Sequence, residues 1–560
     1  MATTRMTGGE ALVKGLIAND IRTLFALPGV QMDAFFNALY DAGDQVRVIQ
    51  SRHEQGAGYM ATGYALATGG VGAYAVVPGP GFLNASAALC TAYATNAKVL
   101  CLCGQIPSAN IGKGIGLLHE IPDQLAVMRS LTKWADRIDR GAEVPAKLSE
   151  ALRQMHAGRP RPVGVEMAMD VMAREDDVGP FAAVQPNGRP AVDLDAVARA
   201  GKLLGEAQRP LIFVGGGAVE AREEVAALAE LVQAPVISGR MGRGVLSSRH
   251  PLSHTMPTAY RLWEHADVVL AVGTRLQIPL MNWGVDDDLK VIRVDNDPEE
   301  PARVAAPAES IVADARDALR ALLPQVERHN RKRSNRADEL REVAQQVAGE
   351  YAYLEPQLSY VRAIRAELPD DGIFVDELTQ IGYVSRFAMP VYGPRTFLST
   401  GYQGTLGWGM AAAVGIKVAQ PDRPVVAVAG DGGFMFTVQE LAVAVQHALD
   451  IVMVVFNDSA YGNVKRMQRE LYGERVIASD LRNPDFARLA EAFGAQGLRA
   501  DSPEALRGAI RQGLATRGPT VIEVPVGEMP DPWKYIYQPR LRGKDKGARN
   551  APGTAGPAKR

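Results

Sequence analysis

Two side chains with oxygen donors stand directly after two short apolar segments. Asp431 follows the segment 425–430, and Asn457 follows the segment 451–456. Such segments are typical of strands buried in a parallel sheet. Because neighbouring parallel strands end at the same edge of a sheet, we expect Asp431 and Asn457 to lie side by side, although they are 26 positions apart. Carboxylate and amide oxygens in this arrangement suit Mg²⁺.

The glycine-rich turn Gly430–Gly433 supplies the means to bind an anion. Its glycines allow a sharp turn and a close approach of backbone N–H groups. The spacing of Thr437 and Glu440 predicts a capping box on the following helix, whose positive end would then face the turn. The same spacing of Thr7 and Glu10 predicts a capped first helix near the N-terminus.

A Gly-Asp-Gly turn alone is most often an ordinary connection between a strand and a helix. Here the second apolar segment continues into Asn-Asp-Ser-Ala-Tyr-Gly at 457–462. The two loops together favour a magnesium diphosphate site.

This segment resembles the thiamine diphosphate motif, in which GDG is followed some two dozen residues later by NN or ND. Its surroundings resemble the superfamily of acetohydroxyacid synthase, benzoylformate decarboxylase and oxalyl-CoA decarboxylase. The resemblance implies that Asp431, Asn457 and the main-chain oxygen of Ser459 hold magnesium, and Asp458 stands where many relatives carry a second Asn. It also implies cofactor contacts from Gly430, Gly432, Gly433, Ala460, Tyr461 and Gly462.

Glu54 is the candidate for starting the chemistry. It lies at a predicted strand end and is followed by glycines and alanines. Taken alone, it would be a solvated Glu at a helix start. However, its flanking residues and the loop 78–81 match the pyrimidine-binding domain of the same superfamily. The resemblance implies that Glu54 hydrogen-bonds N1' of the aminopyrimidine, so that a C2 ylide and then an enamine can form.

A second loop, around His119 and Glu120, resembles the family's segment beside the reacting carbon. Acetohydroxyacid synthases have a Gln-Glu pair where this chain has His119 and Glu120. A histidine there could shuttle a proton or orient a substrate carbonyl. A helix-capping or core histidine is the alternative.

The C-terminal third of the chain carries further resemblances. Thr379 and Gln380 stand where relatives place side chains that contact the diphosphate. The carbonyl of Gly404 would accept a hydrogen from the 4'-amino group, and Leu406 would be the apolar wedge under the bent cofactor. Without the family, Leu406 would simply be a core residue.

Composition describes an ordinary soluble globular protein. The 560 residues are 47% apolar and 22% charged, with a formal net charge of -2. We find no secretory signal and no membrane span, and we expect a cytoplasmic protein that binds no nucleic acid. Three cysteines exclude a disulfide framework.

The length predicts three domains. We expect an α/β protein in which each domain is an open, mainly parallel sheet flanked by helices. The predicted parts are a pyrimidine-binding domain at 1–173, a central domain at 193–325, a diphosphate-binding domain at 356–535, and a basic flexible tail at 540–560.

The central domain contains a possible nucleotide site. Its candidate residues are Gly215, Gly216, Gly217, Arg275 and Asp295. Family members hold FAD or ADP in this domain, or leave it empty. Three glycines after a strand are usually only a tight turn.

The resulting hypothesis is a lyase or carboligase that depends on thiamine diphosphate and Mg²⁺ and acts on a 2-oxo acid such as pyruvate, as acetolactate synthase does. One alternative is a 2-oxo acid decarboxylase or a lyase of 2-hydroxyacyl-CoA or oxalyl-CoA type. Another is a non-catalytic regulatory paralogue. The resemblance implies a homodimer or a dimer of dimers.

Overall fold

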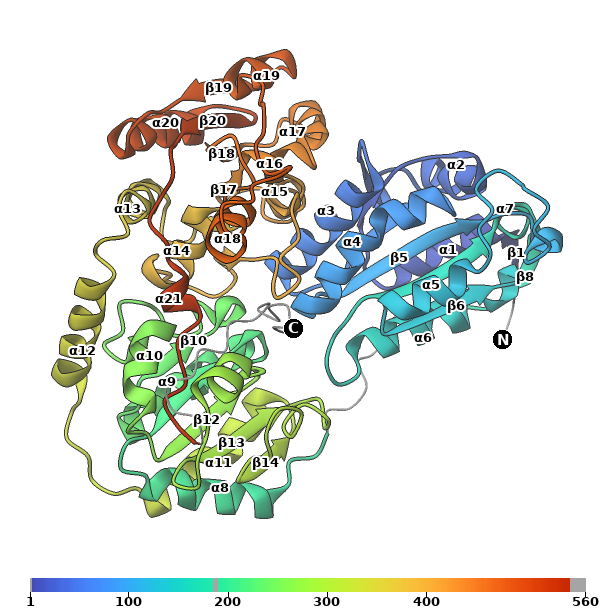
Figure 1. The fold of residues 1–560 in the computed structure, drawn as a ribbon. Coiled ribbons are helices and arrows are strands. Elements are labelled where there is room, and N and C mark those ends of the chain that lie inside the picture. The colour runs from blue at the N-terminus through green and yellow to red at the C-terminus, as the bar shows by residue number, and fades with distance from the viewer. Residues whose placement is uncertain (1–2, 185–189, 544–560) are drawn as a thin grey trace, which may run out of the picture. The chain divides into compact units, whose positions relative to one another are not determined.

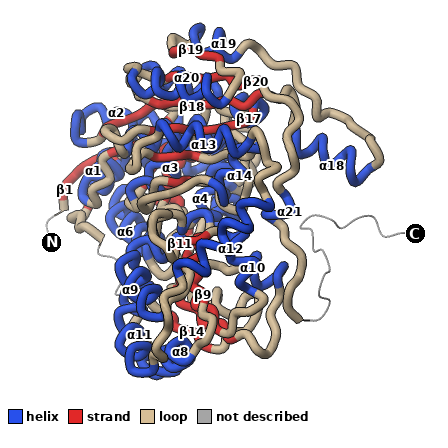
Figure 2. Tube along the Cα trace, turned by 90° about the vertical axis from the view of Figure 1, so that its left-hand side faces the viewer, coloured by secondary structure: helices blue, strands red, loops and turns tan. Residues whose placement is uncertain are grey.

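The computed structural model describes residues 3–184 and 190–543 (Figure 1). Helices and strands alternate along most of this length (Figure 2). Three six-stranded sheets are formed, together with an antiparallel pair of β1 (Thr4–Thr7) and β8 (Glu175–Val178). The predicted α/β class with three parallel-sheet domains is confirmed. Among the described residues, no helix is both long and apolar enough to cross a membrane.

The N-terminal sheet has the order β3-β2-β4-β5-β7-β6, and its strands are parallel. The strands are β2 (Thr23–Ala26), β3 (Arg47–Gln50), β4 (Gly72–Val76), β5 (Val99–Gln105), β6 (Trp134–Ile138) and β7 (Val163–Ala168). The helices are α1 (Gly8–Ala18), α2 (Asp33–Ala42), α3 (Glu54–Thr68), α4 (Pro80–Thr95), α5 (Gln124–Leu131), α6 (Val144–His156) and α7 (Met169–Ala173).

Successive strand residues of this sheet pack on opposite faces. Leu24 and Leu102 belong to a buried cluster with residues of α1, α2 and α6. Phe25 points to the other face, where its ring meets Tyr64 of α3 edge-on. Cys101 is a buried free thiol, and burial raises its pKa to about 12. It therefore packs as a small apolar residue.

The central sheet has the order β11-β10-β9-β12-β13-β14 and is parallel throughout. Its strands are β9 (Leu211–Val214), β10 (Val236–Ser238), β11 (Ser253–His254), β12 (Val268–Val272), β13 (Lys290–Asp295) and β14 (Glu309–Val312). The helices around it are α8 (Leu194–Glu206), α9 (Arg222–Val232), α10 (Met256–Trp263) and α11 (Ala315–His329). The next helices in the chain are α12 (Ala337–Glu350), α13 (Gln357–Glu367) and α14 (Gln380–Ala388).

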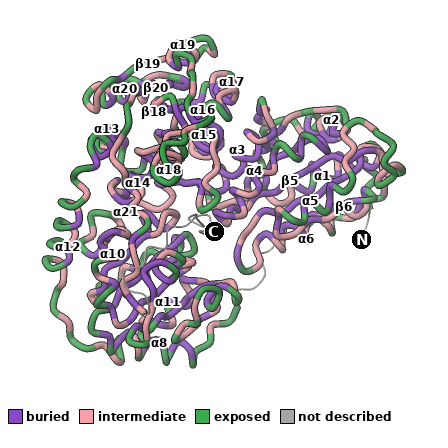
Figure 3. The backbone as a smooth tube through the Cα atoms, in the orientation of Figure 1, coloured by how far each residue is buried: buried purple, intermediate pink, exposed green. Residues whose placement is uncertain are grey.

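The C-terminal sheet has the order β16-β15-β17-β18-β20-β19. Its strands are β15 (Ile373–Val375), β16 (Phe397–Leu398), β17 (Val425–Gly430), β18 (Ile451–Asn457), β19 (Gln496–Arg499) and β20 (Thr520–Pro525). Its helices are α15 (Trp408–Ala419), α16 (Asp431–Met435), α17 (Leu441–Gln446), α18 (Gly462–Tyr472), α19 (Phe486–Ala492) and α20 (Pro503–Ala515). The inner strands β17 and β18 are almost wholly buried (Figure 3).

The described chain groups into two compact units, and the N-terminal and C-terminal sheets share the first of them. Within that unit α3 packs closely on α15, because glycines lie at the contact. A Cβ on Gly63 would lie 2.6 Å from the carbonyl oxygen of Ala412. The ring of Tyr59 meets Trp408 edge-on, 5.9 Å away. The helix that begins at Glu54 is therefore fixed to the C-terminal sheet domain within one chain.

The second unit holds the central sheet and the segment 528–543. This segment includes the short helix α21 (Trp533–Ile536) and contains the buried Arg542 near its end. The Arg542 guanidinium donates to the carbonyl oxygens of Trp263 and Glu264 and pairs with Asp286 at 2.7 Å. The prediction of a flexible tail from 540 onward is therefore wrong for Arg542, and 544–560 lie outside the described residues.

Candidate functional site

Asp431 and the segment that begins at Asn457 lie at the same sheet edge, as their positions after two apolar segments predict. Strands β17 and β18 are parallel neighbours, with Gly430 opposite Phe456. Asp431 opens α16 directly after β17 and is buried. Asn457 is the last residue of β18.

The carboxyl group of Asp431 interacts directly with that of Asp458. Burial raises the pKa of Asp431. Burial also raises the pKa of Asp458 to about 6, and the charge of Asp431 adds to this rise. When two carboxyl groups face each other away from water, ionising both is unfavourable unless a cation lies between them. This donor set fits a small hard divalent cation such as Mg²⁺.

The side chain of Asn457 lies in a hydrogen-bond network that also reaches Asp431. Its amide donates to Glu523 Oε1 at 2.9 Å, and its Oδ1 accepts from the amide of Asn483 at 2.9 Å and from Ser459 N at 3.2 Å. Asn483 also donates to Asp431 Oδ2 at 2.5 Å. The amide of Asn457 thus already has hydrogen-bond partners within the protein, while the carboxyl group of Asp458 interacts with that of Asp431.

The main-chain oxygen of Ser459 was a further predicted metal ligand. It accepts a hydrogen bond from Leu481 N at 2.8 Å, and Tyr461 N donates to Ser479 O at 2.8 Å. Ala460, between them, forms an antiparallel bridge with Asp480. The main-chain oxygen of Ser459 is therefore already engaged in a hydrogen bond within the protein.

The first helix after β17 begins within the glycine turn, earlier in the chain than expected. Helix α16 starts at Asp431 and is followed by the 3₁₀ turn Val438–Glu440 and by α17. The predicted capping box is wrong, because no side chain caps at Thr437. Its hydroxyl instead donates to Gly407 O at 2.8 Å, and Glu440 accepts from Arg52 N at 3.1 Å.

The segment 404–409, which we call the wedge turn, lies against the glycine turn. Gly404 and Gly407 have φ values of 58° and 82°, which glycine adopts without strain. Leu406 Cδ2 would lie 3.6 Å from a Cβ on Gly433. The buried Glu377 carboxylate accepts from the N–H groups of Gly407 at 3.0 Å and Gly409 at 2.6 Å.

Two further predicted residues follow Glu377 in the chain. Thr379 lies beside the glycine turn, since a Cβ on Gly430 would be 3.8 Å from Thr379 Cβ. Gln380 opens α14, and among the described residues its buried Oε1 has no hydrogen-bond partner. That acceptor is the kind of group a bound ligand could satisfy.

Glu54 opens α3 and is largely buried, with 8% of its surface exposed. Asn84 of α4 donates to Glu54 Oε2 at 3.0 Å. A Cβ on Gly81 would lie 3.3 Å from Glu54 Oε1, so the loop 78–81 borders the same carboxylate. The structure thus brings Glu54 and this loop together, as the sequence predicts.

Comparison with protein families finds three matching models. They are described as the N-terminal TPP binding domain, the central domain and the C-terminal TPP binding domain of thiamine pyrophosphate enzymes, and they match residues 6–127, 197–322 and 380–524. The chain belongs to the thiamine pyrophosphate enzyme family.

Curated relatives of this thiamine pyrophosphate enzyme carry two kinds of name. A probable 2-ketoarginine decarboxylase from Pseudomonas aeruginosa is 34% identical over 537 residues, which cover 93% of this chain and 94% of the relative. A probable acetolactate synthase large subunit from Methanocaldococcus jannaschii is 30% identical, with 93% and 92% covered. The acetolactate synthase large subunit of Corynebacterium glutamicum is 31% identical, with 96% and 89% covered.

Glu120 holds the conformation of the loop 113–120 of this thiamine pyrophosphate enzyme. Its carboxylate accepts from the N–H groups of Gly114, Gly116 and Leu117 at 2.7–2.9 Å. These bonds lower the pKa of Glu120. The predicted catalytic role of Glu120 is therefore not supported, because its carboxylate holds the loop.

His119, in the same loop, is oriented by a neighbouring amide. It has a φ of 67°, and its Nδ1 lies 3.0 Å from Gln31 Oε1. The amide of Gln31 in turn donates to Leu118 O at 3.1 Å. The backbone oxygen of His119 lies against Gly79, where a Cβ would be 2.3 Å away. The His119 loop and the loop 78–81 are therefore in contact.

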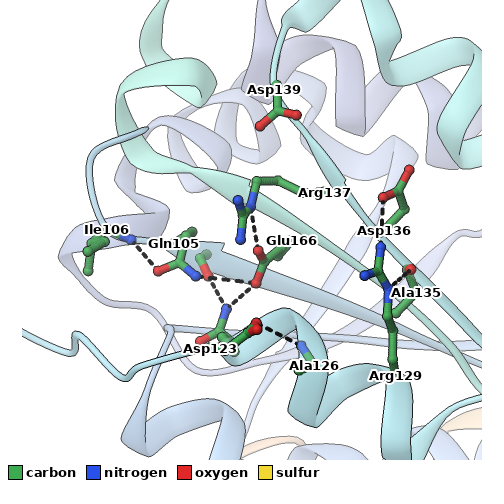
Figure 4. Close-up of polar contacts among 12 residues, drawn as sticks. Gln105, Ile106, Asp123, Ala126, Arg129, Ala135, Asp136, Arg137, Asp139 and Glu166 are labelled. Atoms are coloured by element: carbon green, nitrogen blue, oxygen red, sulfur yellow. Dashed lines mark hydrogen bonds and ion pairs between the residues drawn. The ribbon is translucent and has the colours of Figure 1, made fainter. Parts of the chain in front are cut away.

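A buried polar network supports these loops. Figure 4 shows its central residues, Glu166, Arg137 and Gln105. The fully buried Glu166 pairs with Arg137 at 2.6 Å and accepts from the amides of Gln105 and Gln124 at 3.3 and 2.8 Å. Gln124 Oε1 accepts from Gly79 N at 2.8 Å. The network thus links a charged pair inside the N-terminal domain to the loop that borders Glu54.

The glycines of the central domain serve local packing. Gly215 N donates to Val272 O and Gly217 N to Gly273 O, both at 3.1 Å. A Cβ on Gly215 would lie 2.3 Å from Gly273 O. Two of the three glycine N–H groups of the predicted nucleotide site therefore donate to backbone oxygens within the protein. Gly216, Arg275 and Asp295 remain the other residues of this predicted nucleotide site.

Glu440, a residue without a role in the sequence-based site, contacts the chain just before Glu54. It is fully buried, and a Cβ on Gly56 would lie 2.2 Å from its Oε1. Burial raises its pKa to about 7, opposed by bonds from the backbone N–H groups of Arg52 and His53. Glu440 thus fixes the segment that leads into α3.

The pKa of Glu440 predicts a pH-dependent stability. Its folded value of about 7 lies above the ordinary 4.5, so the folded protein retains a proton that the unfolded chain releases, and stability falls as pH rises through this interval. The effect is on the order of 3 kcal/mol. The Glu440→Gln variant has no group that titrates here. We therefore expect the difference between its Tm and that of wild type to shift in favour of the variant from about pH 5 to about pH 8.

The matched control is Glu491→Gln, at an exposed position. Its Tm relative to wild type should be the same at both pH values. A Glu440→Gln difference that is equally independent of pH would contradict the assignment.

Proposed function

We propose that the protein is a thiamine diphosphate- and Mg²⁺-dependent enzyme that breaks a carbon–carbon bond next to the carbonyl of a 2-oxo acid. The observation that carries this proposal is the interacting pair of the buried Asp431 and the half-buried Asp458 beside the glycine turn. The wedge turn on the same unit and the buried Glu54 would serve the other end of the cofactor.

For the metal we propose Asp431, Asp458 and the main-chain oxygen of Ala460. The carboxyl groups of Asp431 and Asp458 interact directly with each other, whereas the amide of Asn457 donates to Glu523 and its oxygen accepts from Asn483. Three oxygens with two negative charges match the preference of Mg²⁺, which completes its octahedron with water or phosphate oxygens. The glycine turn would offer N–H groups to the same diphosphate.

When bound, thiamine diphosphate supplies the carbanion that attacks the substrate carbonyl and accepts the electron pair released with carbon dioxide. Glu54 would hold a proton at the pyrimidine nitrogen. Its hydrogen bond from Asn84 and its burial keep the carboxyl group in one place. Leu406 would keep the two rings of the cofactor in a bent arrangement.

His119 favours release of an aldehyde as the outcome. A histidine can deliver a proton to the carbon from which carbon dioxide has left, whereas a glutamine at that position cannot. Its orientation by Gln31 is suited to such a role. The decarboxylase name of one relative supports this outcome.

Ligation to a second 2-oxo acid is the second candidate, because several relatives are named acetolactate synthases. We further propose a homodimer or a dimer of dimers, as the resemblance implies, and a cytoplasmic location, as expected from the sequence.

The test of function supplies thiamine diphosphate and Mg²⁺, offers pyruvate and larger 2-oxo acids, including one with a guanidinium group, and follows products by NMR. We expect carbon dioxide with an aldehyde. Acetolactate or another acyloin would instead establish the second candidate. Bound cofactor without turnover of any 2-oxo acid would contradict the substrate class.

The metal assignment predicts that Asp458→Ala weakens thiamine diphosphate binding at fixed Mg²⁺ by about 100-fold or more, since an ionic metal ligand is lost. Asp458→Asn should retain most of the affinity, because an amide oxygen still ligates. The control Asn457→Ala should have a smaller effect than Asp458→Ala in isothermal titration calorimetry. The reverse order of the two alanine variants would refute the assignment.

Glu54→Gln should bind thiamine diphosphate with nearly unchanged affinity and exchange the C2 proton of the bound cofactor about 10² to 10⁴ times more slowly. NMR of acid-quenched samples in D₂O measures this exchange. The control is Glu491→Gln, at the exposed position used above, which should exchange as wild type does. Wild-type exchange in Glu54→Gln would remove the role given to Glu54.

His119→Gln should shift products from aldehyde toward acyloin when a second 2-oxo acid is present, by about tenfold or more, because the proton donor is lost. Gas chromatography of both products gives the ratio. An unchanged ratio with unchanged total decarboxylation would show that His119 does not protonate the intermediate.

A further inference from the structure

Glu377 is a buried acid that belongs to neither set of residues expected to touch the cofactor. It follows β15, and none of its surface is exposed. Its two oxygens accept from two different N–H groups of the wedge turn, Oε1 from Gly407 at 3.0 Å and Oε2 from Gly409 at 2.6 Å. Helix α15 starts between them at Trp408, so the carboxylate caps this helix from a distant part of the chain.

The same carboxylate also reaches the glycine turn. A Cβ on Gly433 would lie only 2.0 Å from Glu377 Oε1. Since Cβ atoms do not approach an oxygen so closely, Gly433 must be glycine for Glu377 to take this position. One side chain thus contacts both the wedge turn and the turn that begins at Asp431. Helices α15 and α16, which start from these turns, lie close together in Figure 1.

A second bond joins the same two segments. Thr437, just after α16, donates to Gly407 O at 2.8 Å. Gly407 therefore has its N–H bound by Glu377 and its carbonyl bound by Thr437. The backbone beside Leu406 is held on both sides.

Burial is the main influence on Glu377. It raises the pKa of this carboxyl to about 7, against the lowering effect of the two N–H bonds. A buried carboxyl with these surroundings is costly to place. A simple helix cap would be served equally well by a small neutral side chain.

We infer that Glu377 is a positioning residue that fixes the distance between the wedge turn and the glycine turn, and so the fit of thiamine diphosphate between them. This inference rests on the proposed function, in which the two turns hold opposite ends of one cofactor. Glu377 acts through Gly407, Gly409 and Gly433. If the hydrogen bonds from Gly407 and Gly409 to Glu377 were lost or weakened, Leu406 could move relative to Asp431.

The test compares wild type, Glu377→Gln and Thr437→Val as full-length proteins. Glutamine keeps the size of Glu377 but turns an N–H donor toward one of the two backbone donors. We expect Glu377→Gln to raise the Kd for thiamine diphosphate at saturating Mg²⁺ at least tenfold in calorimetry. At saturating cofactor, C2 proton exchange should also slow at least tenfold. Thr437→Val should also raise the Kd and slow the exchange, but by smaller factors.

The control is Glu224→Gln, which changes a buried acid of the central domain that contacts neither turn. It should leave Kd and exchange unchanged. If Glu377→Gln lowers the Tm but changes neither quantity, the residue is only a helix cap and the inference is overturned. If Glu377→Gln fails to fold, wild-type Kd and exchange in Thr437→Val overturn it. A wild-type protein that binds no thiamine diphosphate would overturn the proposed function itself.

Discussion

Two carboxylates at one sheet edge, those of Asp431 and Asp458, constrain this structure most strongly. Each has a raised pKa, because both are shielded from water and face the same space. Their joint ionisation requires a positive partner, and the donor set suits a divalent cation. Strand register places them there, since β17 and β18 are paired up to Gly430 and Phe456. The surrounding turns are therefore arranged around this pair of carboxylates.

Other buried acids near the site are stabilised in another way, by backbone N–H groups. Glu377 accepts from the start of α15, and Glu440 accepts from the segment just before Glu54. Helix and loop N–H groups can stabilise an acid without a counter-ion. In both cases the acid comes from one segment and the N–H groups from another, distant in sequence. These contacts hold segments that are distant in sequence in fixed positions relative to one another.

The sequence predicted the strand–turn–strand arrangement around Asp431 because periodicity and glycine content are local signals. All three sheets follow from the same kind of pattern. The capping box shows the limit of local reasoning. It forms at Thr7 and Glu10, whereas the same spacing at Thr437 and Glu440 does not form one, because both side chains bind distant backbone groups.

The sequence-based hypothesis took Asn457 and the Ser459 oxygen as metal ligands, and our proposal moves each of them by one position. Asn457 and Asp458 both carry suitable oxygens, and only the network of Glu523 and Asn483 shows which one is otherwise engaged. Glu120 looked catalytic by resemblance, but its three bonds to nearby N–H groups could not be read from spacing. Glu377 gave no signal of its own, since its partners lie some 30 residues away.

The most direct test of this account is a crystal structure of the full chain with thiamine diphosphate and Mn²⁺ in place of Mg²⁺. Anomalous scattering would locate the metal without assumption. The account predicts one peak within ligand distance of Asp431, Asp458 and the carbonyl of Ala460, with the diphosphate on the glycine turn. A metal held by Asn457 and the Ser459 carbonyl, or no metal at this sheet edge, would contradict it.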